Sequence, residues 1–283
     1  MKELKFNIQY LMKRKELYFS IIIILLINLI HVILCVNESL RLGNFIEGSY
    51  TSEYQFILYN AQISLNVLVI IAFPIVLSLV ISDSSWLDKK NKTVNLLNTR
   101  LNYKKNILVR FFLSFIIAFI ISFLGFLINY ILLRMIYGSG NNLTYFQSLP
   151  FYLENNSLWF LDDLRLVNPT LFVLTINCTV SILLGLLSGL TYICSFFVNQ
   201  RIIIYFIPLI FLILVELLFP LIGIDNISFI SMLQPFSQFN MNSYVIGIII
   251  LLCVNILLLC ISLRKKDVLI WKKFCFQKLS CYI

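Results

Sequence analysis

Residues 18–36 read YFSIIIILLINLIHVILCV, an uncharged and almost entirely apolar stretch. The hydrocarbon core of a bilayer is crossed by about 20 residues of helix, so this stretch is long enough to span it. Inside lipid its backbone amides and carbonyls would meet no water, and a helix pairs all of them within the segment. The stretch therefore predicts a transmembrane helix.

The segment before this stretch, residues 1–17, is polar and basic. Its apolar residues recur at helical spacing, with the lysines away from them; they are Leu4, Ile8, Leu11 and Met12. This pattern predicts an amphipathic helix that lies in the membrane interface, with its lysines near anionic lipid headgroups. The alternative is an ordinary basic flank of the first span that happens to be helical.

Further apolar runs follow along the chain, and 60% of the 283 residues are hydrophobic while only 12% are charged. A soluble domain carries about 25% charged residues, so most of this surface must face lipid. We predict an all-α integral membrane protein that forms a single transmembrane domain over residues 1–283. Its six transmembrane helices are expected at about 18–36, 62–82, 111–137, 169–198, 202–222 and 243–263.

The basic residues predict the orientation of these spans. All but three of the 22 lysines and arginines lie in the N-terminal segment, in the connection 83–110, at Arg201 or in the tail 264–283. Basic residues are enriched on the cytoplasmic side, so both termini are expected there, with 264–283 as a basic cytoplasmic tail. This topology accounts for the net charge of +9, and no nucleic-acid partner is expected. Most acidic residues, Glu53 among them, fall on the other side and are interpreted as solvated loop charges.

The connection 83–110 is too long for a tight turn and too polar to span. Val94, Leu97 and Leu101 recur at helical spacing in it. They predict a short amphipathic helix whose apolar ridge can insert into a groove of a soluble partner. The alternative is a solvated loop with some helical content.

This connection resembles the cytoplasmic loop after the second span in permeases of type-2 ABC exporters. The family pattern runs from an acidic residue through a Lys/Asn-rich stretch, a Thr and a Leu-Leu pair to basic residues before span three. The matching residues are Asp88, Lys89, Lys90, Asn91, Thr93, Leu96, Leu97, Thr99, Arg100, Lys104 and Lys105. The chain has Lys92 where the family usually has Gly, and Arg100 and Leu101 where Pro is common. A second stretch, 227–239, resembles the short apolar helix and Leu-x-Pro-Phe-like motif before span six.

The resemblance implies that the connection is a coupling segment that contacts a cytoplasmic ATP-binding cassette ATPase subunit. The coupling residues carried over are Asp88, Thr93, Val94, Leu96, Leu97, Thr99, Arg100 and Leu101. It also implies a second copy of the permease or a sibling as partner. The chain has no Gly-Lys phosphate loop, so ATP and Mg would bind to the partner ATPase and this chain would bind no cofactor. The expected cargo is a hydrophobic or amphipathic peptide, drug or lipid, moved across a bacterial plasma membrane.

Several polar or small residues fall within the expected spans. Glu216 is an ionisable group at membrane depth and a candidate for function, although a structural or interfacial role is favoured. Ser181, Gly185 and Gly189 recur every four residues, a spacing that lets two helices approach closely, either within the chain or across a dimer. His31 is expected to hydrogen-bond to a neighbouring helix. One histidine and seven scattered cysteines predict no metal site.

Two other function classes remain open at this point. A standalone membrane protein, such as a self-immunity protein or an assembly scaffold, would need no ATPase. An intramembrane enzyme would need converging polar groups, and the spans supply no acidic pair. We expect no catalytic residue in this chain.

Overall fold

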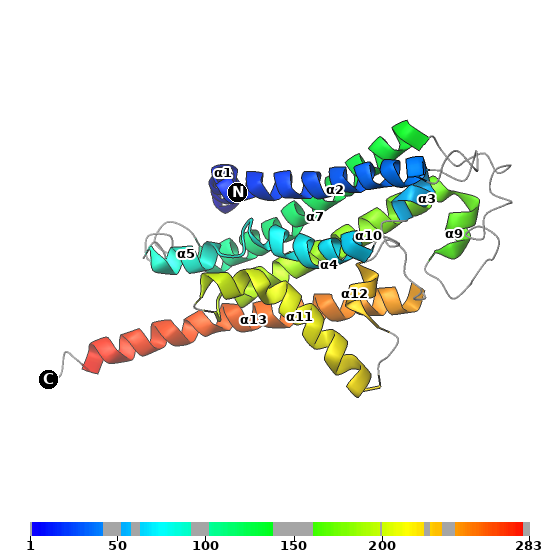
Figure 1. Ribbon diagram of the computed structural model, residues 1–283. Helices are drawn as coiled ribbons and strands as arrows, with labels where there is room; N and C mark the ends of the chain where they lie inside the picture. The colour runs from blue at the N-terminus through cyan, green and yellow to red at the C-terminus, as the bar shows by residue number, and fades with distance from the viewer. Residues whose placement is uncertain are drawn as a thin grey trace.

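The computed structural model describes residues 2–41, 52–57, 63–91, 102–137, 161–198, 200–223, 227–233 and 241–279. All regular elements in these ranges are helices (Figure 1). They are α1 (Lys2–Met12), α2 (Lys15–Arg41), α3 (Ser52–Ile57), α4 (Ile63–Ser78), α5 (Ser84–Lys90), α7 (Tyr103–Tyr137), α9 (Asp162–Val167), α10 (Pro169–Cys194), α11 (Arg201–Leu221), α12 (Phe229–Met232) and α13 (Met241–Leu279).

Five of these helices are long and apolar enough to cross a membrane, namely α2, α7, α10, α11 and α13. Large apolar side chains stay exposed along them, for example Leu26 on α2 and Leu214 on α11. Exposing so many apolar side chains to water would cost free energy, whereas contact with lipid chains is favourable. The chain is therefore a multi-span helical membrane protein.

Helix α10 lies at the centre of the bundle. It packs against α7, α13, α11 and α4. Of its most apolar stretch of 18 residues, 61% is buried inside the protein. Figure 1 shows α2 and α13 on opposite sides, with α4, α7 and α10 between them. The start of α10 follows its sequence: Pro169 occupies the first turn, and the Asn168 side chain accepts a hydrogen bond from the Leu171 amide at 3.1 Å.

The second predicted span is shorter in the structure than the sequence indicated. Helix α4 has 16 residues, so it is about 24 Å long, less than the roughly 30 Å of a hydrocarbon core. After Ser78 the chain turns through Leu79–Asp83 instead of continuing the helix. Side-chain bonds to other helices accompany this end, and the Ser78 hydroxyl is 3.2 Å from the Tyr205 carbonyl.

Hydroxyl groups from neighbouring helices cover the last carbonyls of α4. Ser20 Oγ on α2 lies 2.9 Å from the Val76 carbonyl oxygen. The same hydroxyl lies 2.8 Å from the Glu16 carbonyl oxygen of its own helix. A serine hydroxyl carries one proton, so Ser20 donates to one of the two acceptors at a time.

Helix α1 is separated from α2 by a break at Lys13 and Arg14. Figure 1 shows α1 end-on beside the start of α2, so the two helices run in very different directions. Helix α7 begins at Tyr103, inside the segment that the sequence assigned to the cytoplasmic connection. At the other end of the chain, α13 continues as one helix from Met241 to Leu279.

Candidate functional site

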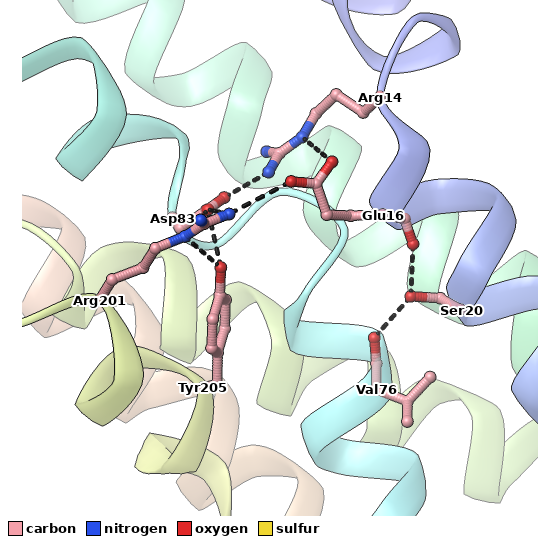
Figure 2. Close-up of polar contacts among 7 residues, drawn as sticks. All are labelled: Arg14, Glu16, Ser20, Val76, Asp83, Arg201 and Tyr205. Atoms are coloured by element: carbon pink, nitrogen blue, oxygen red, sulfur yellow. Dashed lines mark hydrogen bonds and ion pairs between the residues drawn. The ribbon is translucent and has the colours of Figure 1, made fainter. Parts of the chain in front are cut away.

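A cluster of four charged residues lies where the starts of α2 and α11 meet the turn after α4. Asp83 is at its centre and is fully buried. Its Oδ1 accepts from Arg14 Nη2 at 2.6 Å. Its Oδ2 accepts from Arg201 Nε at 2.9 Å and from the Tyr205 hydroxyl at 2.8 Å (Figure 2). We call Arg14, Glu16, Asp83, Arg201 and Tyr205 the inner charge cluster.

Glu16 closes the cluster into a ring. Its Oε2 lies 3.4 Å from Arg14 Nε, and its Oε1 lies 3.2 Å from Arg201 Nη2. The two carboxylates and two guanidinium groups sum to zero charge, which is the condition under which buried ions are tolerated. Three segments far apart in the sequence are thereby joined at one point: the α1–α2 break, the α4–α5 turn and the start of α11.

This environment favours the protonated, positively charged form of Arg14. Burial opposes the charged guanidinium, but attraction and hydrogen bonding to Asp83, together with Tyr10 and Glu16, outweigh it and raise the pKa of Arg14 above its usual value. Arg14 is only 6% exposed, whereas the Arg201 side chain is 39% exposed. The Arg14–Asp83 pair is therefore the shielded part of the cluster, and Arg201 is the more exposed of its two arginines.

A second set of contacts joins α1, α5 and α7. Asp88 on α5, one of the predicted coupling residues, lies 2.5 Å from Arg110 Nη1 on α7 through its Oδ2. Arg110 Nε donates to Asn7 Oδ1 at 2.8 Å. The Asn7 amide donates in turn to Asn106 Oδ1 at 2.7 Å. Asn7, Asn106 and Arg110 are all buried. We call these three residues and Asp88 the α1–α7 network.

Tyr10 on α1 connects the two sets. The guanidinium carbons of Arg14 and Arg110 each lie 5.8 Å from the centre of its ring, within the range of cation–π attraction. Burial raises the pKa of the Tyr10 phenol, with Asp88 and Asp83 adding to the shift and the two arginines opposing it. Tyr10 is thus a neutral ring between two cations, and the charged contacts run continuously from α11 to α5.

The position of α5 gives this arrangement its functional interest. Apart from Asp88, the predicted coupling residues lie outside the described residues; they are Thr93, Val94, Leu96, Leu97, Thr99, Arg100 and Leu101. The chain enters that segment from α5 and leaves it into α7. The Asp88–Arg110 pair therefore joins the two helices that flank this segment, and Arg110 joins them to α1 through Asn7.

The small residues of α10 meet aromatic rings of α7. An added Cβ on Gly185 would lie 3.0 Å from both the Phe115 ring and the Phe115 carbonyl oxygen. At Gly189 the nearest atom would be in the Phe111 ring, at 2.8 Å. Ser181 is buried and contacts Asn177 on its own helix, with its Oγ 3.5 Å from the amide oxygen. These glycines therefore make room for a close α7–α10 approach within one chain.

Glu216 lies near the end of α11 and receives the start of α12. Its Oε1 accepts from the Ser228 hydroxyl at 2.6 Å and from the Ile230 amide at 2.9 Å. Ser228 itself caps α12 by accepting from the Ser231 amide. These bonds give Glu216 a structural role that holds the short helix α12 against α11.

The interpretation of Glu53 as a solvated loop charge is wrong. Glu53 on α3 is fully buried. Its Oε1 accepts from the Tyr130 hydroxyl at 2.8 Å and from the Thr170 hydroxyl at 3.1 Å. The residue thus links α3 to α7 and α10 through hydroxyl donors, which makes its burial tolerable.

His31 lies in a polar contact between α2 and α7. Its Nδ1 lies 3.3 Å from the Asn129 amide oxygen, and its Nε2 lies 3.3 Å from the Cys35 sulfur. The amide nitrogen of Asn129 donates to the Asn28 carbonyl at 2.9 Å. A thiol, an imidazole and an amide in this order could support nucleophilic chemistry, but Cys35 and His31 are both buried. We interpret the set as a polar contact in the core.

No group of three or more metal-binding side chains occurs within the part of the chain that the structure describes. The site residues that sequence reasoning missed are Arg14 and Arg201, which it counted as markers of topology, and Asp83, which it placed at the start of the connection 83–110. Comparison with known proteins finds no matching family model, curated protein or solved structure. The functional interpretation therefore depends on the geometry of the site and on the sequence.

Proposed function

We propose that the chain is the transmembrane permease subunit of an ATP-binding cassette exporter. In this proposal it has six spans, with α4 as the short second span, and both termini lie in the cytoplasm of a bacterial cell. ATP and Mg bind to a separate ATPase subunit, and a second permease copy or sibling completes the pathway. The cargo is a hydrophobic or amphipathic peptide, drug or lipid.

The observation that carries the proposal is the attachment of α5 to the rest of the bundle. A coupling segment must pass a displacement from the ATPase to the helices that line the pathway. In the sequence, segment 92–101 follows α5 and precedes α7, and the Asp88–Arg110 pair joins these two flanks within the α1–α7 network. The Asp83 contacts extend the connection to α11. A solvated loop without a partner would not need so many buried charged contacts at its base.

The basic residues support the same orientation. Arg14, Arg110 and Arg201 all belong to the linked contacts described above, so they share one end of the bundle. Lys104 and Lys105 are exposed at the start of α7. This concentration of positive charge favours the cytoplasmic side for that end.

The test is affinity purification of the tagged chain from its native host in mild detergent, followed by mass identification of co-purifying chains and an ATP hydrolysis assay. We expect a stoichiometric ATPase, lost when Leu97 and Leu101 are both replaced by Asp. Asn102→Asp is the matched control, because it adds a carboxylate at an exposed position beside the same segment. It should keep the ATPase bound.

A preparation without any ATPase, in a detergent that preserves known complexes, would overturn the proposal. It would favour the standalone membrane protein, for which the double Leu→Asp variant should behave as the native chain does. Retention of a stoichiometric ATPase by the Leu→Asp variant would contradict the role assigned to segment 92–101.

A further inference from the structure

Helix α1 presents three different faces, and only one of them is covered by protein. The covered face carries Asn7 and Leu11, whose exposed fractions are 1% and 3%. Asn7 is bonded to Asn106 and Arg110 of α7. Two faces of the helix are therefore available to something other than this chain's described residues.

The second face is apolar and uncovered. Leu4, Ile8 and Met12 follow each other at four-residue intervals and are 45%, 42% and 57% exposed. The apolar surface continues onto α2, where Tyr18 and Phe19 are exposed as well. The Tyr18 hydroxyl donates to the Met12 carbonyl at 3.0 Å. Because α1 lies across the start of a transmembrane helix (Figure 1), this stripe lies where the apolar face of an interfacial helix enters the bilayer.

The third face is cationic. Lys5 and Gln9 are exposed on it, Lys13 is exposed directly after the helix, and Lys15 is exposed at the start of α2. Of the acidic neighbours, Glu16 belongs to the inner charge cluster. The pKa of Glu3 is lowered chiefly by a backbone hydrogen bond at the start of α1, and nearby positive charges that include Lys105 add to the shift. The exposed surface around α1 is therefore positive, directly beside an apolar stripe.

We propose that α1 binds anionic phospholipid headgroups and that this binding stabilises the α1–α7 network. Lysines next to an inserted apolar stripe lie at the depth of the lipid phosphates and attract lipids of net negative charge. Asn7 and Tyr10 belong to the same short helix, so anchoring α1 also holds their contacts with Arg110 and Arg14. The inference does not rest on the proposed permease function, because it concerns lipid and this chain alone.

The test measures backbone amide hydrogen exchange of residues 2–12 in the full chain reconstituted in nanodiscs. One preparation uses phosphatidylcholine alone, and the other mixes it with phosphatidylglycerol. Each lysine near an anionic surface changes the binding constant roughly fivefold. We therefore expect exchange in α1 to be slower with phosphatidylglycerol by about tenfold or more, and the difference to shrink at high salt. Lys5→Gln combined with Lys13→Gln should remove most of it.

Lys90→Gln is the control, because it neutralises an exposed lysine on α5 rather than on α1. It should leave the lipid dependence unchanged. Equal exchange in the two lipid mixtures would overturn the proposal. So would a lipid dependence that survives loss of Lys5 and Lys13, or one that Lys90→Gln reduces equally. An ATPase that fails to co-purify would not affect any of these outcomes.

Discussion

Replacement of Asp83 by Asn tests the inner charge cluster most directly. The two side chains have nearly the same shape, so the change removes the charge without opening a cavity. It leaves the Arg14 guanidinium buried, with Glu16 at 3.4 Å as its remaining carboxylate partner among the described residues. Removing one partner of a buried pair costs about 3–5 kcal/mol, because the other charge remains uncompensated. We expect Asp83→Asn to lower the free energy of unfolding by that amount.

Arg201→Gln is the comparison variant for the expected loss in the free energy of unfolding. Arg201 also bonds to Asp83, but its side chain is 39% exposed. Water solvates such a charge in either state, so the expected loss is about 1 kcal/mol or less. The double variant Asp83→Asn/Arg14→Gln should lose less than the sum of its single changes, because the second substitution removes the orphaned charge.

The measurement is reversible unfolding of the purified chain in mixed micelles of mild detergent and increasing sodium dodecyl sulfate. Each variant is compared with the native chain by its transition midpoint and slope. A loss for Arg201→Gln as large as that for Asp83→Asn would refute the reasoning, because burial would then not determine the cost. Strict additivity in the double variant would show that Arg14 and Asp83 do not act as a pair.

Other side chains lead to predictions in the same assay or in simple chemistry. Gly185→Ala places a Cβ 3.0 Å from the Phe115 carbonyl, which cannot move without α7, so we expect a loss of about 1–3 kcal/mol; no loss would show that the α7–α10 contact is loose. Glu53→Ala removes the carboxylate that accepts from the buried Tyr130 hydroxyl and should lower the free energy of unfolding by about 1–3 kcal/mol. Glu53→Gln keeps an acceptor and should cost less. The reverse order would contradict the assigned bonds. The Cys35 thiol is 1% exposed and, with the other cysteines replaced by alanine, should react with a membrane-permeant maleimide only after unfolding; rapid labelling of the native chain would place it on the surface.

Much of the fold could be predicted because hydropathy alone places helices in lipid. The structure has long helices over five of the six predicted spans. The early end of α4 could not be foreseen in this way. Its serines are tolerated by a hydropathy scale, and the bond between Ser78 and the Tyr205 carbonyl joins residues 127 positions apart. Contacts that depend on the fold in this way are not visible in a hydropathy profile.

The charged residues of the site illustrate a different limit. Asp83, Arg14 and Arg201 were visible in the sequence as charges at the ends of spans. Their pairing joins residues separated by 69 and 118 positions, and nothing in a single sequence indicates that these ends converge. Glu53 was misassigned for the same reason, since its donors Tyr130 and Thr170 lie on other helices. An acidic residue between spans is usually solvated, and only its partners show otherwise.

The end of α4 is held by two kinds of bond that respond differently to movement. If α4 moves away from α2, Ser20 keeps a hydrogen bond, because its proton can turn from the Val76 carbonyl to the Glu16 carbonyl. Moving α4 away from α2 at Ser20 therefore costs little free energy. Arg14 Nη2 donates to Asp83 Oδ1 at 2.6 Å, whereas Arg201 and Tyr205 donate to Oδ2, so separation from Arg14 costs Asp83 the buried partner of its Oδ1. The contact at Asp83 is therefore the firm one and the contact at Ser20 the yielding one, so α4 is expected to tilt about its C-terminal end rather than slide along its axis.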